Sequence, residues 1–369
     1  MLLSSAFRPD SYDDLPGWRE DDQELAFEAF RRSAFRVLEK PYRTGSLGVD
    51  CAAFDPAYAE ARASAGLDDS AARSFFERHF TPCLVTPSSG SGRGFVTGFY
   101  EPEADASPVR TDKFRFPLYA RPADLVDIDD ANRPDRLDPY LAFGRQTADG
   151  IVEYHDRGEI ERGALAGRGL EFAWLEDPVD VFFIHVQGAA RLRMPDGAVR
   201  RVTYAAKSGQ RFSGPGRILA DLGEIPLADV TMQSIRAWFR ANPERIDEIL
   251  WQNRSFIFFR EAAVDDPALG PVAAAKVPLT PGRSVAVDRL LHTFGTPFFI
   301  VAPDLAAFGG TPFRRLMIAQ DTGSAIVGAA RGDLFAGCGD AAGEIAGVVR
   351  SAADFYALVP SSLIAGHSG

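Results

Sequence analysis

The 369-residue chain has few of the residues from which metal centres and disulfide frameworks are built. It contains three cysteines, Cys51, Cys83 and Cys338, without a CxxC pair, and its five histidines show no HExxH or similar spacing. Structural zinc sites need closely spaced Cys and His ligands, so we expect no metal ion. A bridge between Cys51 and Cys83 stays open for an oxidising compartment and would leave Cys338 free.

A surplus of positive charge and a long hydrophobic run are also missing. Lys and Arg number 40 against 51 Asp and Glu, which gives a net charge of −11. Because nucleic-acid binding draws on clustered basic residues, the scattered arginines exclude a nucleic-acid partner. No apolar run reaches the roughly 18 residues of a membrane span, and the opening residues 1–18 are too short and polar for a signal peptide. We therefore expect a cytosolic protein, or one whose targeting segment is absent from this chain.

The pattern of apolar residues predicts helices first and strands afterwards. Residues 22–39 have near-helical apolar spacing, and a second helix is expected from Asp69. From Pro82 to about Pro278 most segments are typical of strands, among them 180–194, and four short strand-like runs follow Asn253. The fold class is therefore mainly β with N-terminal helices, an α+β protein.

A glycine-rich stretch from Arg314 to Gly347 presents two carboxylates. An apolar run leads into Asp321, and Asp333 follows 12 residues later (333 − 321 = 12). Frequent glycines permit positive φ angles and close approach of backbone to a ligand, so we expect the chemistry here. The Asp-Thr-Gly-Ser sequence at Asp321 resembles the active-site turn of aspartic proteases. Those enzymes need two such aspartates, and no second copy of the motif exists in this chain.

Six blocks carry a more extensive resemblance. They follow one another in the order and approximate spacing of the membrane-bound lytic murein transglycosylase A (MltA) family, and the last two resemble its C-terminal triple-aspartate (3D) domain. The three aspartates are Asp288, Asp321 and Asp333. The blocks are GFVTGFYEP (94–102), FFIHVQGAARL (182–192), YAAKSGQRF (204–212), QNRSFIFFRE (252–261), PLTPGRSVAVDR (278–289) and AQDTGSAIVGAARGDLFAG (319–337).

The resemblance implies a two-domain protein without a metal or organic cofactor. Residues 1–102 and 246–369 would form a discontinuous catalytic domain that resembles a double-psi β-barrel. Residues 103–245 would form an inserted β-barrel domain, with a glycan groove between the two. The implied reaction cleaves the β-1,4 bond between N-acetylmuramic acid and N-acetylglucosamine in peptidoglycan without water, and it leaves a 1,6-anhydro-muramyl end.

The same resemblance implies that one carboxyl group acts twice. Asp333 would protonate the leaving glycosidic oxygen and then accept the proton of the muramyl C6 hydroxyl. Because that hydroxyl is tethered to the ring, its attack benefits from a high effective molarity. Asp321 would lie close by, and as an anion it would raise the pKa of Asp333, as would the apolar neighbours Leu334 and Phe335.

Further positions match the substrate-binding parts of the family. Short polar and aromatic side chains suit sugar rings, which offer both hydroxyls and apolar faces. Glu101 is a candidate second acid, and a cap or salt bridge is its alternative. His185 is expected to be a structural histidine in a strand. The expected substrate-binding residues are Thr97, Tyr100, Gln187, Gly188, Lys207, Ser255 and Asp288, the last with a structural role as its alternative.

The expected partner is the glycan strand of peptidoglycan, bound by a monomer in the periplasm, with association to the outer membrane left open. A protein partner in a wall-remodelling complex is also left open. Two functional alternatives stand beside the transglycosylase: a non-catalytic peptidoglycan-binding protein and a conventional glycoside hydrolase that gives reducing ends.

Overall fold

The computed structural model describes residues 3–87 and 92–365, and its contacts divide the chain into two compact units. The first unit comprises Met1–Tyr100 and Asp266–Gly369, and the second comprises Glu101–Asp265. These bounds differ from the expected domains at residues 101–102 and 246–265. The second of these segments carries β12 (Ile257–Ala262), which pairs with β11 (Val199–Lys207). The protein is a mixed α/β fold with mostly strands, in two major sheets.

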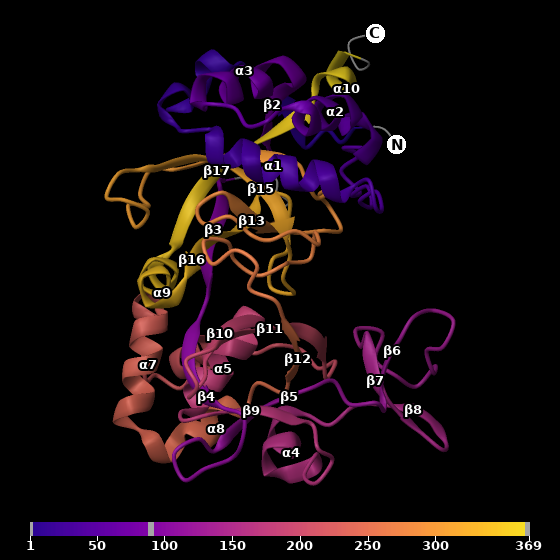
Figure 1. Ribbon diagram of the computed structural model, residues 1–369, viewed down its shortest axis with the longest axis vertical. Helices are drawn as coiled ribbons and strands as arrows, with labels where there is room; N and C mark the ends of the chain where they lie inside the picture. The colour runs from indigo at the N-terminus through magenta and orange to yellow at the C-terminus, as the bar shows by residue number, and fades with distance from the viewer. Residues whose placement is uncertain (1–2, 88–91, 366–369) are drawn as a thin grey trace. The chain divides into compact units, whose positions relative to one another are not determined.

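The first unit is built on an eight-stranded sheet that combines N-terminal and C-terminal segments, indigo to purple and orange to yellow in Figure 1. Its strand order is β1-β2-β17-β14-β15-β13-β16-β3, and an additional pairing of β17 with β3 closes six of these strands into a ring. The strands are β1 (Phe7–Pro9), β2 (Phe80–Val85), β3 (Gly94–Glu101), β13 (Ser284–Val287), β14 (Pro297–Ala302), β15 (Phe313–Asp321), β16 (Arg331–Cys338) and β17 (Arg350–Pro360).

Aromatic side chains attach the N-terminal helices to this sheet. The predicted helices at 22–39 and from Asp69 are confirmed as α1 (Glu24–Arg36) and α3 (Asp69–His79). Asp68 caps α3, because its side chain accepts the Ala71 N–H at 2.8 Å. Phe30 of α1 is fully buried, and its ring contacts those of Phe75, Phe76 and Phe80. The remaining helices of this unit are α2 (Asp55–Ala63), α9 (Gly339–Val348) and α10 (Ser361–Ala365).

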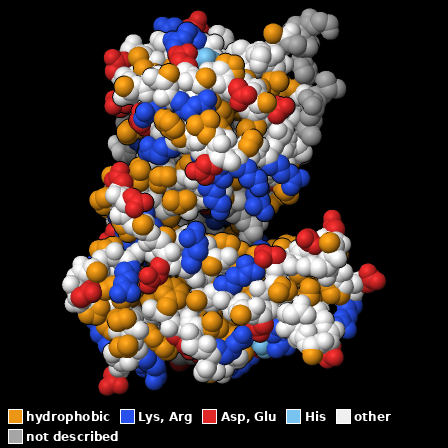
Figure 2. All heavy atoms as spheres, turned by 45° about the vertical axis from the view of Figure 1, so that its right-hand side comes forward, with side chains coloured by type: hydrophobic (Ala, Val, Ile, Leu, Met, Phe, Trp, Pro, Cys, Tyr) orange, Lys and Arg blue, Asp and Glu red, His pale blue; other side chains and the backbone are white. Residues whose placement is uncertain are grey.

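The second unit has a six-stranded sheet in the order β12-β11-β10-β4-β9-β5 and a three-stranded sheet β6-β7-β8. A parallel bridge between Ala120 and Phe259 links the two ends of the larger sheet. On the face of each unit that Figure 2 shows, acidic and basic side chains are interspersed. The further elements are β4 (Glu103–Ser107), β5 (Phe116–Tyr119), β6 (Leu125–Asp127), β7 (Phe143–Thr147), β8 (Gly150–Val152), α4 (Arg157–Glu159), β9 (Glu171–Leu175), α5 (Pro178–Gln187), β10 (Ala189–Arg193), α6 (Pro215–Asp221), α7 (Met232–Ala241) and α8 (Ile246–Leu250).

The strand expected over 180–194 is wrong for its first half, which forms α5, so His185 lies on a helix. The physical reason is the chemistry of the helix ends. Asp177 caps the N-terminus by accepting the Val179 N–H, and Pro178 suits the first turn. Gly188 ends the helix in the left-handed conformation (φ 75°). These end signals outweigh the strand preference of the β-branched and aromatic residues between them.

A buried ion pair joins the N-terminal segment to the sheet of the first unit. Arg283 Nη1 lies 2.8 Å from Asp21 Oδ2, and the same carboxylate accepts the Leu316 N–H at 2.7 Å.

We predict that Arg283→Met lowers the free energy of unfolding by about 3–5 kcal/mol, because the Asp21 charge then stays buried without its cation. Urea unfolding measures this, and Arg19→Met, which breaks the exposed pair with Asp13, is the control with little expected effect. Equal losses in the two variants would contradict the prediction.

Candidate functional site

Strand pairing in the first unit places Asp321 and Asp333 on either side of one residue. Ala286 of β13 is in register with Asp321 of β15 on one side and with Asp333 of β16 on the other. Residues paired in this way project to the same face of a sheet. Two strand spacings separate their backbones by about 10 Å. The two carboxyl groups can lie closer than this, because their side chains can lean toward each other. The two carboxyl groups of the glycine-rich stretch therefore share one face, and both are partly buried.

Asp333 is held by a short chain of hydrogen bonds. The Thr97 hydroxyl of β3 donates to Asp333 Oδ1 at 2.5 Å, and Arg331 Nη2 donates to Thr97 Oγ1 at 2.7 Å. Burial raises the pKa of Asp333, while the Thr97 hydrogen bond and the Arg331 charge act in the opposite direction. Burial thus favours the neutral form of this carboxyl group, and its two polar neighbours favour the charged form.

Asp321 lies against the loop that precedes β13. Its Oδ1 accepts the Ala274 N–H at 3.2 Å, and Lys276 stands nearby in the left-handed conformation (φ 62°). Burial raises the pKa of Asp321 to about 6, and the charge of Asp333 adds to this rise, whereas backbone hydrogen bonds and Lys276 oppose it. The effect of the Asp333 charge on Asp321 agrees with the strand register, in which both residues pair with Ala286.

Asp288, the third aspartate, organises the backbone around the pair. It follows β13, and its carboxylate accepts the N–H of Leu290 at 3.0 Å and the N–H of Gly328 at 2.9 Å. Gly328 has φ 118°, a conformation that glycine adopts without strain. One carboxylate oxygen of Asp288 thus binds backbone of the turn after β13 and the other binds backbone of the glycine-rich stretch, an arrangement that favours the structural alternative over contact with substrate.

Tyr100 packs against a helix next to the site. Its ring is buried, and a Cβ placed on Gly343 of α9 would come within 2.9 Å of it, so the close packing requires glycine there. Thr97 and Tyr100 both belong to β3, which neighbours β16 in the sheet. Thr97, a predicted substrate-binding residue, thus hydrogen-bonds Asp333 directly.

The other predicted residues belong to the second unit. Glu101 is buried there and accepts hydrogen bonds from Arg191 and Arg201, which corresponds to the salt-bridge alternative. His185 is buried too, and burial holds its pKa well below the usual value. The four predicted glycan contacts lie at element ends and stay predictions: Gln187 and Gly188 at the end of α5, Lys207 at the end of β11 and the buried Ser255 before β12.

Two residues of the candidate site, Arg331 and Lys276, were not predicted from the sequence. Arg331 lies two positions before Asp333, and strand alternation alone puts both on one face of β16. That signal was available from the sequence. Lys276 had no comparable signal, because a lysine in the left-handed region is uncommon and its proximity to Asp321 arises from a loop.

The structure also bears on metal binding, on the cysteines and on membrane-spanning helices. Among residues 3–87 and 92–365, no group of three His, Cys, Asp or Glu side chains is arranged to hold a metal ion. The bridge left open between Cys51 and Cys83 is absent from the structure, in which both are buried thiols. Within the same residues, no helix has the length and apolar character needed to cross a bilayer.

Comparison with known proteins places this site in a defined class. The MltA specific insert domain model matches residues 95–260, and the 3D domain model matches residues 283–359. A crystal structure of membrane-bound lytic murein transglycosylase from Agrobacterium tumefaciens is 50% identical and superposes with a TM-score of 0.91, covering 98% of this chain and 99% of that one. MltA from Neisseria gonorrhoeae is 33% identical with a TM-score of 0.77, covering 97% of each chain.

The fold and site thus define a 3D-domain protein with an MltA insert, and the chain belongs to the MltA family. Membrane-bound lytic murein transglycosylase A of Escherichia coli K12 is 33% identical over 257 residues. This alignment spans 68% of the chain and 61% of that relative. E. coli MltA with bound chitohexaose is a further similar structure, 25% identical with a TM-score of 0.69, covering 98% of this chain and 96% of that one.

The raised pKa of Asp321 predicts how stability depends on pH. An unfolded Asp titrates near 3.9, whereas folded Asp321 titrates near 6, so between these values the folded state binds more protons. Stability therefore falls as pH rises from about 4 to 6, by up to about 3 kcal/mol from this residue. We predict that Asp321→Asn abolishes this residue's contribution to the fall in unfolding free energy, because asparagine does not titrate. Unfolding free energies of both proteins at pH 4, 5, 6 and 7 measure it, and a constant difference between them would contradict the prediction.

Proposed function

We propose that the protein is a lytic transglycosylase that cleaves the β-1,4 bond between N-acetylmuramic acid and N-acetylglucosamine in peptidoglycan and forms 1,6-anhydro-muramyl ends. The observation that carries this proposal is the coupled pair Asp321 and Asp333, partly buried on one face of the sheet in a chain of the MltA family. Binding of chitohexaose by E. coli MltA supports a glycan as the ligand.

Asp333 is the proton carrier in this proposal. Its raised pKa keeps a proton available for the glycosidic oxygen. Once that proton has left, the Thr97 hydroxyl and the Arg331 charge stabilise the carboxylate, which then accepts the proton of the muramyl C6 hydroxyl. The opposing influences on Asp333 therefore suit a group that must be an acid in one step and a base in the next.

Asp321 supports this cycle by its charge and position. Two neighbouring carboxyl groups cannot both ionise readily, so the pair retains a proton to a higher pH than a lone aspartate would. In the proposal the proton shared by the pair reaches the glycosidic oxygen from Asp333, and the Ala274 N–H stabilises the charge of Asp321 when that carboxyl group is ionised. Lys276 limits the rise in the pKa of Asp321.

The six-strand ring of the first unit supports the double-psi barrel as the catalytic domain, and the bridged sheet of the second unit supports the inserted barrel. In the proposal the catalytic domain supplies Thr97 and Tyr100. The inserted domain supplies Gln187, Gly188, Lys207 and Ser255 as glycan contacts. The relatives named as membrane-bound support action at the cell envelope, in the periplasm.

The central test of the proposal replaces the proton carrier. Asp333→Asn should fold normally and lower turnover by about 10² to 10⁴-fold or more, because the acid and base steps both lose their group. Mass spectrometry of products from purified sacculi measures anhydro-muropeptides, and Asp304→Asn, an exposed aspartate of the same unit, is the matched control.

The products also separate the alternatives. Borohydride reduction modifies reducing ends and leaves anhydro ends unchanged, so reducible products would reveal a hydrolase. Binding to sacculi without any product would reveal a non-catalytic protein. Undiminished release of anhydro-muropeptides by Asp333→Asn would refute the assignment of Asp333.

Arg331 gives a second test through the pH profile. Its charge lowers the pKa of Asp333, so Arg331→Gln should raise that pKa. The alkaline limb of the kcat/KM profile, where the acid loses its proton, should then move to higher pH. A rate that falls equally at every pH would show that Arg331 only maintains the fold.

A further inference from the structure

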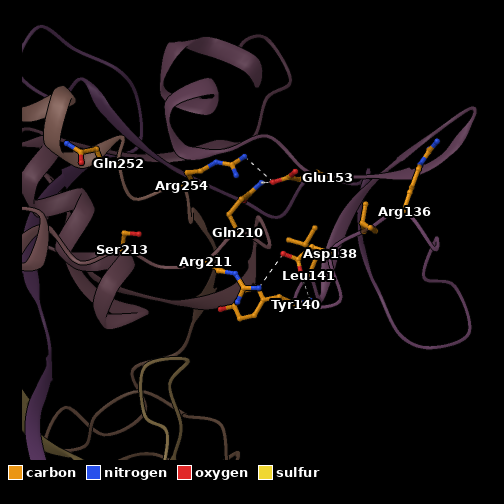
Figure 3. Close-up of a pocket in the computed structure, with 11 residues that line it drawn as sticks. Arg136, Asp138, Tyr140, Leu141, Glu153, Gln210, Arg211, Ser213, Gln252 and Arg254 are labelled. Atoms are coloured by element: carbon orange, nitrogen blue, oxygen red, sulfur yellow. Dashed lines mark hydrogen bonds and ion pairs between the residues drawn. The ribbon is translucent and has the colours of Figure 1, made fainter.

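The second unit contains a cavity of about 360 Å³ that none of the predicted roles uses (Figure 3). Its wall is formed by the loop between β6 and β7, the residue after β8, and the segments that follow β11 and precede β12. The volume lies within the range of about 300–1,000 Å³ that is usual for ligand pockets. Because every lining residue lies within 136–254, the cavity is a feature of this unit alone.

One buried group in the wall has an unused acceptor. Gln210 is 3% exposed, and its Nε2 donates to the Tyr154 carbonyl oxygen at 2.6 Å. This bond fixes the amide orientation, because the flipped amide would set two acceptor oxygens against each other. Its Oε1 then has no hydrogen-bond partner among the described residues. A buried acceptor left unpaired is unfavourable, so an N–H or O–H donor of a ligand that reaches this oxygen would stabilise the wall.

Two arginines give other parts of the wall a positive character. Arg136 is exposed and makes no ion pair with the part of the chain that the structure describes. Arg211 lies 4.0 Å from the centre of the Tyr140 ring and pairs with Asp138 at 3.3 Å. Both side chains of that pair are more than half exposed, so it is weak and can be exchanged for a ligand carboxylate.

A third arginine is already neutralised. Arg254 pairs with Glu153 at 3.0 Å and with Asp156 at 3.1 Å. Figure 3 shows this pair near Gln210, and Arg211 with Tyr140 and Asp138 in another part of the wall. The pocket thus offers an acceptor in one part and cations with an aromatic ring in another, a combination that suits a ligand with amide N–H groups and free carboxylates.

We propose that this pocket binds the stem peptide of peptidoglycan, the short peptide attached to the lactyl group of muramic acid. A peptide N–H donates to Gln210 Oε1, and the carboxylates of the peptide accept from Arg136 and Arg211. The proposal rests on the proposed function, since it names a further part of the same substrate.

The location of Lys207 links the pocket to the glycan. Its Nζ lies 5.4 Å from the centre of the Tyr140 ring, and Lys207 is a proposed contact of the acetamido or lactyl groups. A stem peptide begins at the lactyl group, so a strand held by Lys207 presents its peptide beside Tyr140.

The test compares two substrates that differ only in the peptide. Soluble glycan strands with stem peptides are assayed beside the same strands stripped by an amidase, with Arg136→Gln/Arg211→Gln as the variant. The ratio of kcat/KM for peptide-bearing to stripped strands should fall about tenfold or more relative to wild type, because two charge-assisted contacts are lost. Arg110→Gln, an exposed arginine of the same unit, removes one charge elsewhere and should leave the ratio unchanged. Gln210→Met should lower the ratio without a change of charge.

Stripped strands also carry carboxylates, those of the lactyl groups. An unchanged ratio with lower kcat/KM on both substrates would assign the arginines to the lactyl carboxylate and overturn the proposal, as would no change on either substrate. A direct arm measures binding of the free stem tetrapeptide to wild type and to the double variant by calorimetry. Binding that depends on the two arginines, in a wild type that releases no anhydro ends, would refute the proposed function and support the pocket.

Discussion

The hydrogen-bonded register of β13 is the constraint on which the candidate site depends. This short, fully buried strand pairs in parallel with β15 and antiparallel with β16, and Ala286 faces an aspartate on each side. A shift of one residue in either pairing would turn one carboxyl group to the opposite face of the sheet. The turn held by Asp288 follows this strand, so the third aspartate contributes to the site by fixing backbone.

The chemistry of the site arises from a balance between burial and hydrogen bonding. Burial raises the pKa of both Asp321 and Asp333, while donors around each carboxyl group stabilise its charged form. Sequence reasoning assigned the rise in the pKa of Asp333 to the charge of Asp321 together with the apolar neighbours Leu334 and Phe335. In the structure burial is the cause, and it is Asp333 whose charge raises the pKa of Asp321. The pair therefore depends on how far the surrounding sheet excludes water.

Local patterns predicted the regular elements well where propensity and end signals agree. The strand-like runs after Asn253 became β12 to β15, and the amphipathic pattern of 22–39 became α1. The prediction was wrong where they disagree, at α5, because apolar β-branched residues suit a strand while Asp177, Pro178 and Gly188 specify a helix. At the site, motif order identified the aspartates, and strand alternation would have identified Arg331.

The sequence by itself determined the family, the predominance of strands and the identity of the carboxyl groups, because these depend on residue types and their order along the chain. Tertiary structure alone decided which groups share an environment. Thr97 meets Asp333 across 236 residues of chain, and Gln210 meets the Tyr154 carbonyl across 56. Such contacts follow from sheet pairing and loop closure, which no local pattern records. For the same reason, no local pattern predicts that Gln210 Oε1 lacks a partner among the described residues or that Arg211 pairs with Asp138.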